Sequence, residues 1–518
     1  MDRWRVIVLA LLFAFWSIET INLDRHPPLH EDEAWILSPG YKWSRQGVFG
    51  SDLFTGFYGM EQHYFEFPPL MSIAQGMSAR VFGLNAWSMR YLPVAFGILI
   101  MAMTFAIARR LSHSLAALLA VCLLIVWQWR PAGDRMLYSG IPLIDVSRIA
   151  RYDVLAALLG LCALWCFIQA RASQSARYEI ACGIFIGLAG LAQLYGSFWL
   201  VALSAVLLID RIGFTRRPIW RTFTRLFIGA FSVWSMWLVV IAMNWQDFVG
   251  QVGINQGRFS VLDPAFYLDN LKREVYRWFP LGRAAALATP GGWLLMVGAP
   301  AALVWLIVRT ARQRDARALW LLMPTLIFSA LLAVLVQSKN FDYLISLVPL
   351  VTMAAAWLLA GLWQSRRWRA VAALVLLSIG LSGTISLIQM QRHAEQATTP
   401  NAFFAELQQI IPPDARVIGV PQYWLALSDR AYRSIVLPFY LSDPALNRAP
   451  LSFEAALTAI APQFVVIDPS LVETFGDRSS PHDQGVSFWA YLNRHDAQVV
   501  ATLTDNDGSL MQVYRLNP

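Results

Sequence analysis

Short polar motifs interrupt an otherwise apolar chain, and their residue types suit acid–base chemistry. HPPLHEDEAW holds Glu31, Asp32 and Glu33 directly after the first apolar segment, and SRIARYDVLAALLG holds Arg151 and Asp153. A carboxylate can take a proton from an attacking hydroxyl, and it is costly near lipid unless it is solvated or paired. A solvated loop explains the first motif about equally well, and a helix cap explains Asp153 about equally well.

Two further motifs carry cations that suit phosphate binding. NQGRF contains Arg258, and SKNFDYLISLVPL contains Lys339, Asp342 and Tyr343. Arg can hold phosphate oxygens through a bidentate fork, whereas Lys acts as a compact charge. A lone loop Arg is usually a surface charge, and Lys339 is also compatible with a flanking residue that reaches the membrane interface.

The composition is that of a membrane protein. Of the 518 residues, 57% are hydrophobic and 14% are charged, whereas soluble domains have about 25% charged residues. The formal charge of +8 does not indicate a nucleic-acid partner, because most cations punctuate apolar runs. The expected partner is the lipid bilayer. The four Cys lie in apolar stretches and show neither a disulfide framework nor zinc spacing.

Eleven segments are apolar enough to cross a membrane, for which about 20 residues are needed. They cover approximately 6–23, 90–107, 114–129, 154–169, 180–194, 198–209, 226–244, 293–308, 319–336, 344–363 and 371–388. The first has no small-residue cleavage site after it, so we expect an uncleaved helix. Arg residues mark the short loops of one side, which the positive-inside rule makes cytoplasmic. We therefore expect a cytoplasmic N-terminus and outer loops at about 24–89, 130–152 and 245–292.

The composition changes near residue 390, which divides the chain into a predicted transmembrane domain, 1–390, and a predicted soluble domain, 391–518. In the second part, the β-prone runs ARVIGV, SIVLPFY, QFVVID, AQVVATL and MQVYRL alternate with the helical patterns SFEAALTAIA and SFWAYLNR. This alternation predicts a small α/β domain. Eleven spans put it outside the plasma (inner) membrane, on the periplasmic or extracellular side.

Together the motifs resemble those of GT-C glycosyltransferases, which include protein O-mannosyltransferases and bacterial lipid A aminoarabinose transferases. HEDEAWILSPGYKWSRQGVFG, YFEFPPLMSIAQGMSARVFGLNAWSMRYLPVAFG, RIARYDVLAALLG, NQGRF and SKNFDYLISLVPL follow the family's order over about residues 1–365. The resemblance implies a polytopic α-helical fold of the GT-C type. It also implies inverting transfer of a monosaccharide from a polyprenyl-phosphate donor to a hydroxyl of a lipid, glycan or protein acceptor.

The resemblance further implies roles for single residues. Asp32 matches the catalytic aspartate, and Asp153 matches the second acidic position. Apart from the resemblance, the chemistry of a general base makes Glu33 the reserve for Asp32. The implied donor-phosphate residues are Arg258, Lys339, Tyr343 and Arg151, and the implied sugar-pocket residues are Tyr64 and Glu66. Phe67 departs from the Lys of the aminoarabinose transferases, which argues against aminoarabinose and lipid A. The tryptophan-rich motif of oligosaccharyltransferases is also missing, which argues against a large preassembled glycan.

Metal use and the rival function stay open at this point. The sequence has no zinc-type ligand set, although Asp32 and Asp153 would suit Mg²⁺ or Mn²⁺ if the fold brings them together. A transporter or flippase for a lipid-linked sugar would place ionisable residues in the middle of its spans. Here the spans are nearly free of charge and the acids gather at the outer surface, which favours the enzyme. A structural or assembly protein would leave the acidic loops without a function.

Overall fold

The contacts of the chain divide it into two compact units. The computed structural model describes residues 3–132, 139–214, 219–255, 260–475, 483–504 and 508–517. The first unit contains Met1–Ile21, Pro93–Val239 and Arg258–Arg392, and the second contains Asn22–Leu92, Val240–Gly257 and His393–Pro518. Residues 22–92, which hold the expected first outer loop, and the C-terminal region therefore belong to the same unit, although about 300 residues separate them along the chain.

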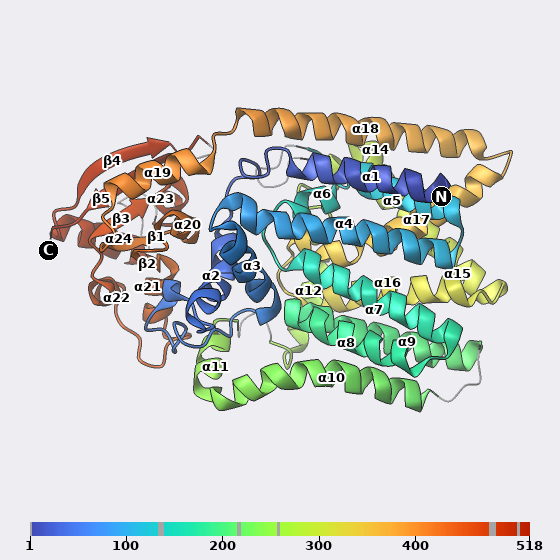
Figure 1. Ribbon diagram of the computed structural model, residues 1–518, viewed down its shortest axis with the longest axis horizontal. Helices are drawn as coiled ribbons and strands as arrows, with labels where there is room; N and C mark the ends of the chain where they lie inside the picture. The colour runs from blue at the N-terminus through green and yellow to red at the C-terminus, as the bar shows by residue number, and fades with distance from the viewer. Residues whose placement is uncertain are drawn as a thin grey trace. The chain divides into compact units, whose positions relative to one another are not determined.

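The first unit is built from long apolar helices (Figure 1). The long helices are α1 (Arg3–Thr20), α4 (Ala86–Leu111), α5 (Ser114–Val126), α7 (Asp153–Ser173), α8 (Ala176–Ala192), α9 (Phe198–Gly213), α10 (Trp220–Met243), α15 (Ala299–Arg312), α16 (Ala316–Leu335), α17 (Val348–Gln364) and α18 (Arg369–Gln396). The shorter elements are α6 (Pro142–Ser147), η2 (Leu194–Ser197), α12 (Pro264–Trp278), α13 (Arg283–Leu287), α14 (Pro290–Trp293), η4 (Leu294–Gly298) and η5 (Phe341–Ser346). Each apolar segment expected from the sequence coincides with one of the long helices to within several residues.

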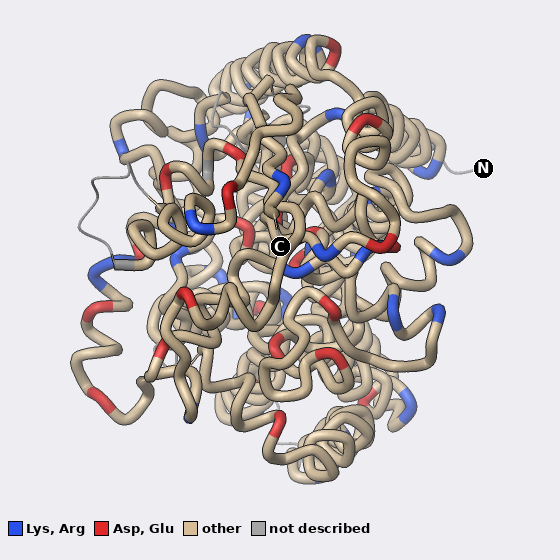
Figure 2. Tube along the Cα trace, turned by 90° about the vertical axis from the view of Figure 1, so that its left-hand side faces the viewer, with Lys and Arg blue, Asp and Glu red and all other residues tan. Residues whose placement is uncertain are grey.

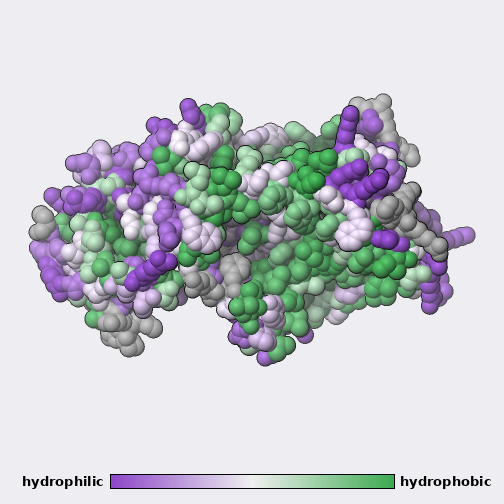
Figure 3. Space-filling view, turned by 90° about the horizontal axis from the view of Figure 1, so that it is seen from below, coloured by the Kyte–Doolittle hydropathy of each residue, from purple (hydrophilic) through white to green (hydrophobic). Residues whose placement is uncertain are grey.

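Length and composition identify the helices that suit a bilayer. In the described part of the chain, seven helical segments are long and apolar enough to cross one, and α5 and α17 are shorter apolar helices. The chain is thus a multi-pass membrane protein. The most apolar window of α7 is 83% buried, whereas that of α10 is only 17% buried. Helix α7 therefore lies in the core, and α10 exposes apolar residues such as Phe227 and Met236. Figure 3 shows the extensive apolar surface over the helices, which lipid contact would cover.

The second unit combines short helices with a small sheet. Its helices are α2 (Glu31–Gln46), η1 (Asp52–Phe54), α3 (Pro69–Phe82), α11 (Trp245–Val252), α19 (Pro400–Ile410), η6 (Pro421–Tyr423), α20 (Trp424–Leu427), α21 (Val436–Ser442), α22 (Phe453–Ile460), α23 (Pro469–Phe475) and α24 (Asp483–Arg494). Its strands are β1 (Arg416–Gly419), β2 (Ala431–Ser434), β3 (Phe464–Ile467), β4 (Gln498–Thr504) and β5 (Leu510–Arg515), in the order β2-β1-β3-β5-β4. Strand β1 is parallel to β2 and β3, and β5 is antiparallel to β3 and β4. Acidic and basic residues are interspersed in the view of Figure 2.

One β-prone run is not a strand. Strand β2 ends at Ser434, the backbone of Ile435 turns into the α region, and the rest of SIVLPFY forms helix α21. The helix buries Leu437 and Tyr440. A short apolar run cannot be assigned to strand or helix from periodicity alone, which explains the wrong prediction. The other four runs contain strands, and both predicted helical patterns are confirmed as α22 and α24.

Helices α2 and α3 cross at two glycines. A Cβ atom on Gly40 would lie 1.6 Å from the carbonyl oxygen of Ser72, and one on Gly76 would lie 2.0 Å from the carbonyl oxygen of Gly40. Backbone therefore packs directly on backbone, and only Gly permits this distance. The contact fixes the direction of α2 within the second unit.

Gly76→Ala is expected to lower the free energy of unfolding by at least about 1–3 kcal/mol, because the methyl group forces two backbones apart. Thermal unfolding of purified protein, followed by tryptophan fluorescence, would show a lower midpoint. Gly361→Ala is the control, since a Cβ atom there meets nothing within 4 Å. An unchanged midpoint in Gly76→Ala would contradict the close crossing.

Candidate active site

Helix α2 begins at the acidic cluster of the first outer loop. Its N-cap residue is His30, whose Nδ1 atom accepts a hydrogen bond from the backbone N–H of Asp32 at 3.1 Å. The Asp32 carboxylate lies in the first helical turn, where the helix dipole stabilises negative charge. Its side chain is 23% exposed, and its Oδ2 atom is 3.7 Å from His30 Nδ1. Asp32 is thus a partly accessible carboxylate on a rigid helix end.

The next residue along the helix, Glu33, is a carboxylate in the opposite environment. Glu33 and Arg90 are fully buried, and Arg90 donates from Nε and Nη2 to the two Glu33 oxygens at 2.8 and 2.7 Å. The guanidinium also donates to the carbonyl oxygens of Leu23, Pro27 and Pro28. Glu33 also accepts a hydrogen bond from the backbone N–H of His30, the residue before α2, at 2.9 Å. This pair therefore holds the chain on both sides of the acidic cluster and leaves Glu33 little access to a substrate.

A third carboxylate of this unit, Glu66, lies among aromatic residues. Its Oε2 atom accepts hydrogen bonds from Trp35 Nε1 at 2.9 Å and from the Tyr64 hydroxyl at 3.2 Å. Its Oε1 atom accepts one from the hydroxyl of Tyr440, on α21, at 3.4 Å. The Tyr440 ring stacks on Phe54 with 5.7 Å between centroids. Burial, and then the nearby Glu66 carboxylate, raises the pKa of Tyr64 well above 10, so the hydroxyl stays a donor.

The segment that carries Tyr64 and Glu66 is fastened by helix α11. Buried Gln251 accepts a hydrogen bond from the backbone N–H of Phe65 at 2.7 Å and donates to the carbonyl oxygens of Tyr58 and His63. A side-chain amide that satisfies three backbone groups holds the segment in one conformation. The Glu66 cluster thus combines residues from the first outer loop and the C-terminal region.

In the first unit, Asp153 lies at the start of α7 and is fully buried. Arg151 Nε donates to its Oδ2 atom at 2.9 Å, and the Tyr195 hydroxyl donates to its Oδ1 atom. Asp342 Oδ2 lies 3.6 Å from the same Arg151 nitrogen. One guanidinium therefore serves two carboxylates, and Asp153 acts as the acceptor of a buried network.

Residues 339–343, just after α16, connect several cationic side chains. The guanidinium of Arg130 lies 4.2 Å from the centre of the Phe341 ring. That of Arg277 lies 5.7 Å from the centre of the Tyr343 ring, which is also 5.1 Å from the Tyr195 ring. Together with the Arg151–Asp342 contact, these distances show that the segment lies against three Arg side chains of the first unit.

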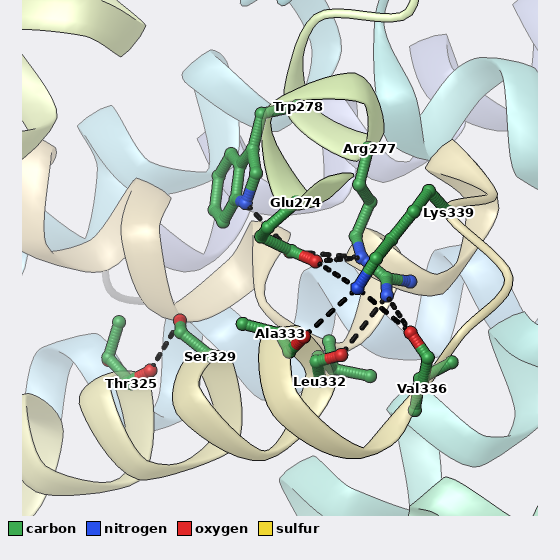
Figure 4. A network of polar contacts seen from close by, with 9 residues as sticks. All are labelled: Glu274, Arg277, Trp278, Thr325, Ser329, Leu332, Ala333, Val336 and Lys339. Carbon is green, nitrogen blue, oxygen red and sulfur yellow. Dashed lines mark hydrogen bonds and ion pairs between the residues drawn. The ribbon is translucent and has the colours of Figure 1, made fainter. Parts of the chain in front are cut away.

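Lys339 and Arg277 share one carboxylate, that of Glu274 on α12 (Figure 4). Lys339 Nζ donates to Glu274 at 2.9 Å and to the carbonyl oxygens of Ala333 and Val336. These carbonyls lie at the C-terminal end of α16, where they have no partner within the helix. Burial lowers the pKa of Lys339 below its usual 10.5, against the opposing effect of Glu274.

The structure gathers the residues expected from the sequence into two groups. Arg151, Asp153, Lys339 and Tyr343 lie in the first unit, and Asp32, Glu33, Tyr64 and Glu66 in the second. Arg258 lies outside the described residues. Their proposed roles stay predictions.

Sequence reasoning missed several partners in these groups, namely Arg90, Tyr195, Gln251, Glu274, Arg277 and Tyr440. The Glu274–Arg277 pair has helical i,i+3 spacing, which was a readable signal. Arg90 lies in the quoted RYLP motif, but nothing in the sequence links it to Glu33.

Among the described residues, no group of three or more His, Cys, Asp or Glu side chains is arranged to hold a metal ion. Asp32 and Asp153, the pair expected from the sequence, belong to different units. Their joint binding of Mg²⁺ or Mn²⁺ stays a prediction.

Comparison with known proteins identifies the fold. The family model for dolichyl-phosphate-mannose-protein mannosyltransferases matches residues 66–237, which is less than half of the chain. No curated protein sequence matches the chain. ArnT from Cupriavidus metallidurans, solved with bound undecaprenyl phosphate, aligns at 16% identity and a TM-score of 0.61 over 98% of both chains. The oligosaccharyltransferase AglB from Archaeoglobus fulgidus, solved with an inhibitory peptide and a dolichol-phosphate, aligns at 12% identity and a TM-score of 0.57, over 99% of this chain and 74% of AglB. This chain has the GT-C fold. The resemblance seen in the sequence motifs is thereby confirmed at the level of fold.

Replacing Arg90 by Leu leaves the Glu33 carboxylate buried without its cation. Breaking one side of a buried ion pair costs about 3–5 kcal/mol, so we expect a large fall in the thermal unfolding midpoint. The double variant Arg90→Leu with Glu33→Leu should recover much of it, because no buried charge remains. Arg448→Leu, at an exposed position of the same unit, is the control. Equal midpoints for Arg90→Leu and Arg448→Leu would show that the pair does not anchor this loop.

Proposed function

We propose that the protein is an inverting glycosyltransferase. It moves a monosaccharide, a hexose or a pentose, from a polyprenyl-phosphate donor to a hydroxyl of a lipid, glycan or protein at the outer face of the membrane. The observation that carries the proposal is the contrast between two neighbouring carboxylates: Glu33 is locked by Arg90, while Asp32 stays partly accessible on the same helix end. The GT-C fold supports it, since the proteins that share the fold act on lipid-linked sugars.

In this proposal Asp32 is the general base. The acceptor hydroxyl is a poor nucleophile until a carboxylate removes its proton, and such a base contributes about 10²–10⁴-fold to the rate. The rigid N-terminus of α2 keeps the carboxylate in one orientation. Glu33 is assigned a positioning role through Arg90, in place of the reserve role that the sequence suggested.

The leaving group is the donor phosphate, whose negative charge grows as the glycosidic bond breaks. Fixed cations that face this charge stabilise the transition state more than the ground state. We assign this role to Lys339 and Arg258, with Tyr343 and Arg151 on the donor side. Asp153 orients this group through Arg151 and Tyr195, with which it is hydrogen-bonded.

The sugar is assigned to the Glu66 cluster. A carboxylate that accepts hydrogen bonds from sugar hydroxyls, next to aromatic rings that pack on the sugar face, is a common arrangement for polar ligands with apolar faces. Glu66, Tyr64 and the rings of Trp35 and Tyr440 supply both features. Phe67 lies beside Tyr64 and Trp35 and adds an apolar surface to the cluster. The aminoarabinose transferases have a Lys at this position, so we expect a sugar other than aminoarabinose.

The topology expected from the sequence completes the proposal. Eleven spans place the N-terminus in the cytoplasm and residues 391–518 on the periplasmic or extracellular side of the plasma membrane. The expected first outer loop then carries Asp32 and Glu66 on that same side, and the short loop between the ninth and tenth spans carries Lys339 there. A polyprenyl carrier suits this geometry, since its lipid tail stays in the bilayer while the sugar faces outward.

The test is transfer by purified protein in lipid, with a panel of radiolabelled polyprenyl-phosphate sugars and membrane extracts as acceptor. Asp32→Asn should lower kcat by about 10²–10⁴-fold, because the amide cannot take the proton. Asp414→Asn, at an exposed position of the same unit, should transfer like the wild type. Full transfer by Asp32→Asn would remove Asp32 from catalysis, and no transfer from any donor by the wild type would argue against the enzyme.

A further inference from the structure

The Glu274 carboxylate collects hydrogen bonds from three side chains. Arg277 Nε donates to both of its oxygens, at 3.0 and 3.1 Å, Lys339 Nζ donates at 2.9 Å, and Trp278 Nε1 donates at 3.2 Å (Figure 4). Two of these donors are cationic. An arrangement in which an Arg, a Lys and an indole N–H converge on one anion is also what binds a phosphate oxygen.

The charges around Glu274 do not balance. Arg277 and Lys339 carry two positive charges, and Glu274 supplies one negative charge. The remaining donors of the two cations go mostly to neutral carbonyl oxygens at the end of α16, those of Leu332, Ala333 and Val336. Arg273 adds a further positive charge that acts on Lys339. The cluster therefore keeps a net positive charge, which favours the binding of an anion.

One hydrogen-bond donor of the cluster is unused. Arg277 is completely buried, and its Nη1 atom has no hydrogen-bond partner among the described residues. A buried donor without a partner costs about 1–3 kcal/mol, so native proteins rarely keep one without a reason. The Tyr343 ring lies beside this guanidinium, on the segment assigned above to the donor side.

We propose that Glu274 is an exchangeable counter-ion that occupies the place of the donor phosphate on Arg277 and Lys339. This inference rests on the proposed function, and it adds Arg277 to the phosphate-binding residues. When the polyprenyl-phosphate sugar binds, its phosphate takes over the Arg277 and Lys339 donors, and the Glu274 side chain turns away. After transfer, Glu274 returns to the two cations and competes with the polyprenyl phosphate that remains.

The exchange explains how a strongly cationic site releases its product. The phosphate gains negative charge when the glycosidic bond breaks, so the product would bind these cations more tightly than the donor does. An internal competitor lowers both affinities, because the apparent affinity falls in proportion to the fraction of molecules with an open site. Glu274 thus lowers the affinity for the donor and speeds the release of the product.

Binding of undecaprenyl phosphate to the full-length protein in nanodiscs of zwitterionic lipid tests the inference. Glu274→Gln removes the competing charge but keeps the size of the side chain, and it should bind at least about tenfold more tightly than the wild type. Glu274→Asp withdraws the carboxylate by one methylene and should show a smaller gain. Asp269→Asn is the matched control, because Asp269 lies on the same helix, is 66% exposed and pairs only loosely with Lys272. It should leave the affinity unchanged.

Steady-state kinetics supply the second measurement. Glu274→Gln should lower the KM for the donor and also lower kcat, because product release slows, whereas a purely structural role would lower kcat with an unchanged or higher KM. If the wild type binds undecaprenyl phosphate and Glu274→Gln binds no more tightly, the exchange is wrong while the proposed function stands. If neither protein binds it, the polyprenyl-phosphate donor itself is wrong, and the exchange fails with it.

Discussion

The buried ion pair between Glu33 and Arg90 holds the N-terminal end of helix α2 in place. A buried guanidinium is tolerable only when nearly all of its donors are satisfied, and here a carboxylate and three loop carbonyls take them. The same carboxylate accepts the backbone N–H that opens the helix. These hydrogen bonds hold the loop before α2, and the loop in turn fixes the position of Asp32 at the start of the helix. Two neighbouring acidic residues thus have different environments, since Glu33 is buried against a cation and Asp32 is 23% exposed.

The first unit uses helix ends in a related way. The C-terminal carbonyls of α16 attract Lys339 and Arg277, so two cations gather at a point that has no carboxylate of its own. Glu274 on α12 then compensates part of the charge. The segment that follows α16 brings Asp342 to Arg151 and Tyr343 to Arg277 within a few residues. This short segment thus links Arg151, just before α7, with Arg277 on α12 and with carbonyl oxygens at the end of α16.

The sequence predicted those features that follow from local composition. Lipid requires long apolar helices, so the apolar segments appear as helices at nearly the expected places. The polar motifs directed attention to the regions around Asp32, Asp153 and Lys339, whose roles stay predictions. Pairings between distant residues were not readable: Glu33 and Arg90 are 57 residues apart, and Tyr440 and Glu66 are 374 apart. Helices α2 and α3 were also hidden, because they lie in a polar loop and pack on each other through glycines. The SIVLPFY run was assigned to a strand because its length and apolar character fit either structure.

The hydrogen bond from Tyr440 to Glu66 has a consequence for how such chains can diverge. A C-terminal region that made no contact with the rest of the chain could be exchanged between related proteins as a module. Here the C-terminal region supplies a ring and a hydroxyl to a cluster whose other members come from the first outer loop. A chimaera that takes this region from another protein would therefore change the surroundings of Glu66 unless it keeps Tyr440 and helix α21. A substitution in either stretch would therefore alter the hydrogen bonds and ring contacts around Glu66.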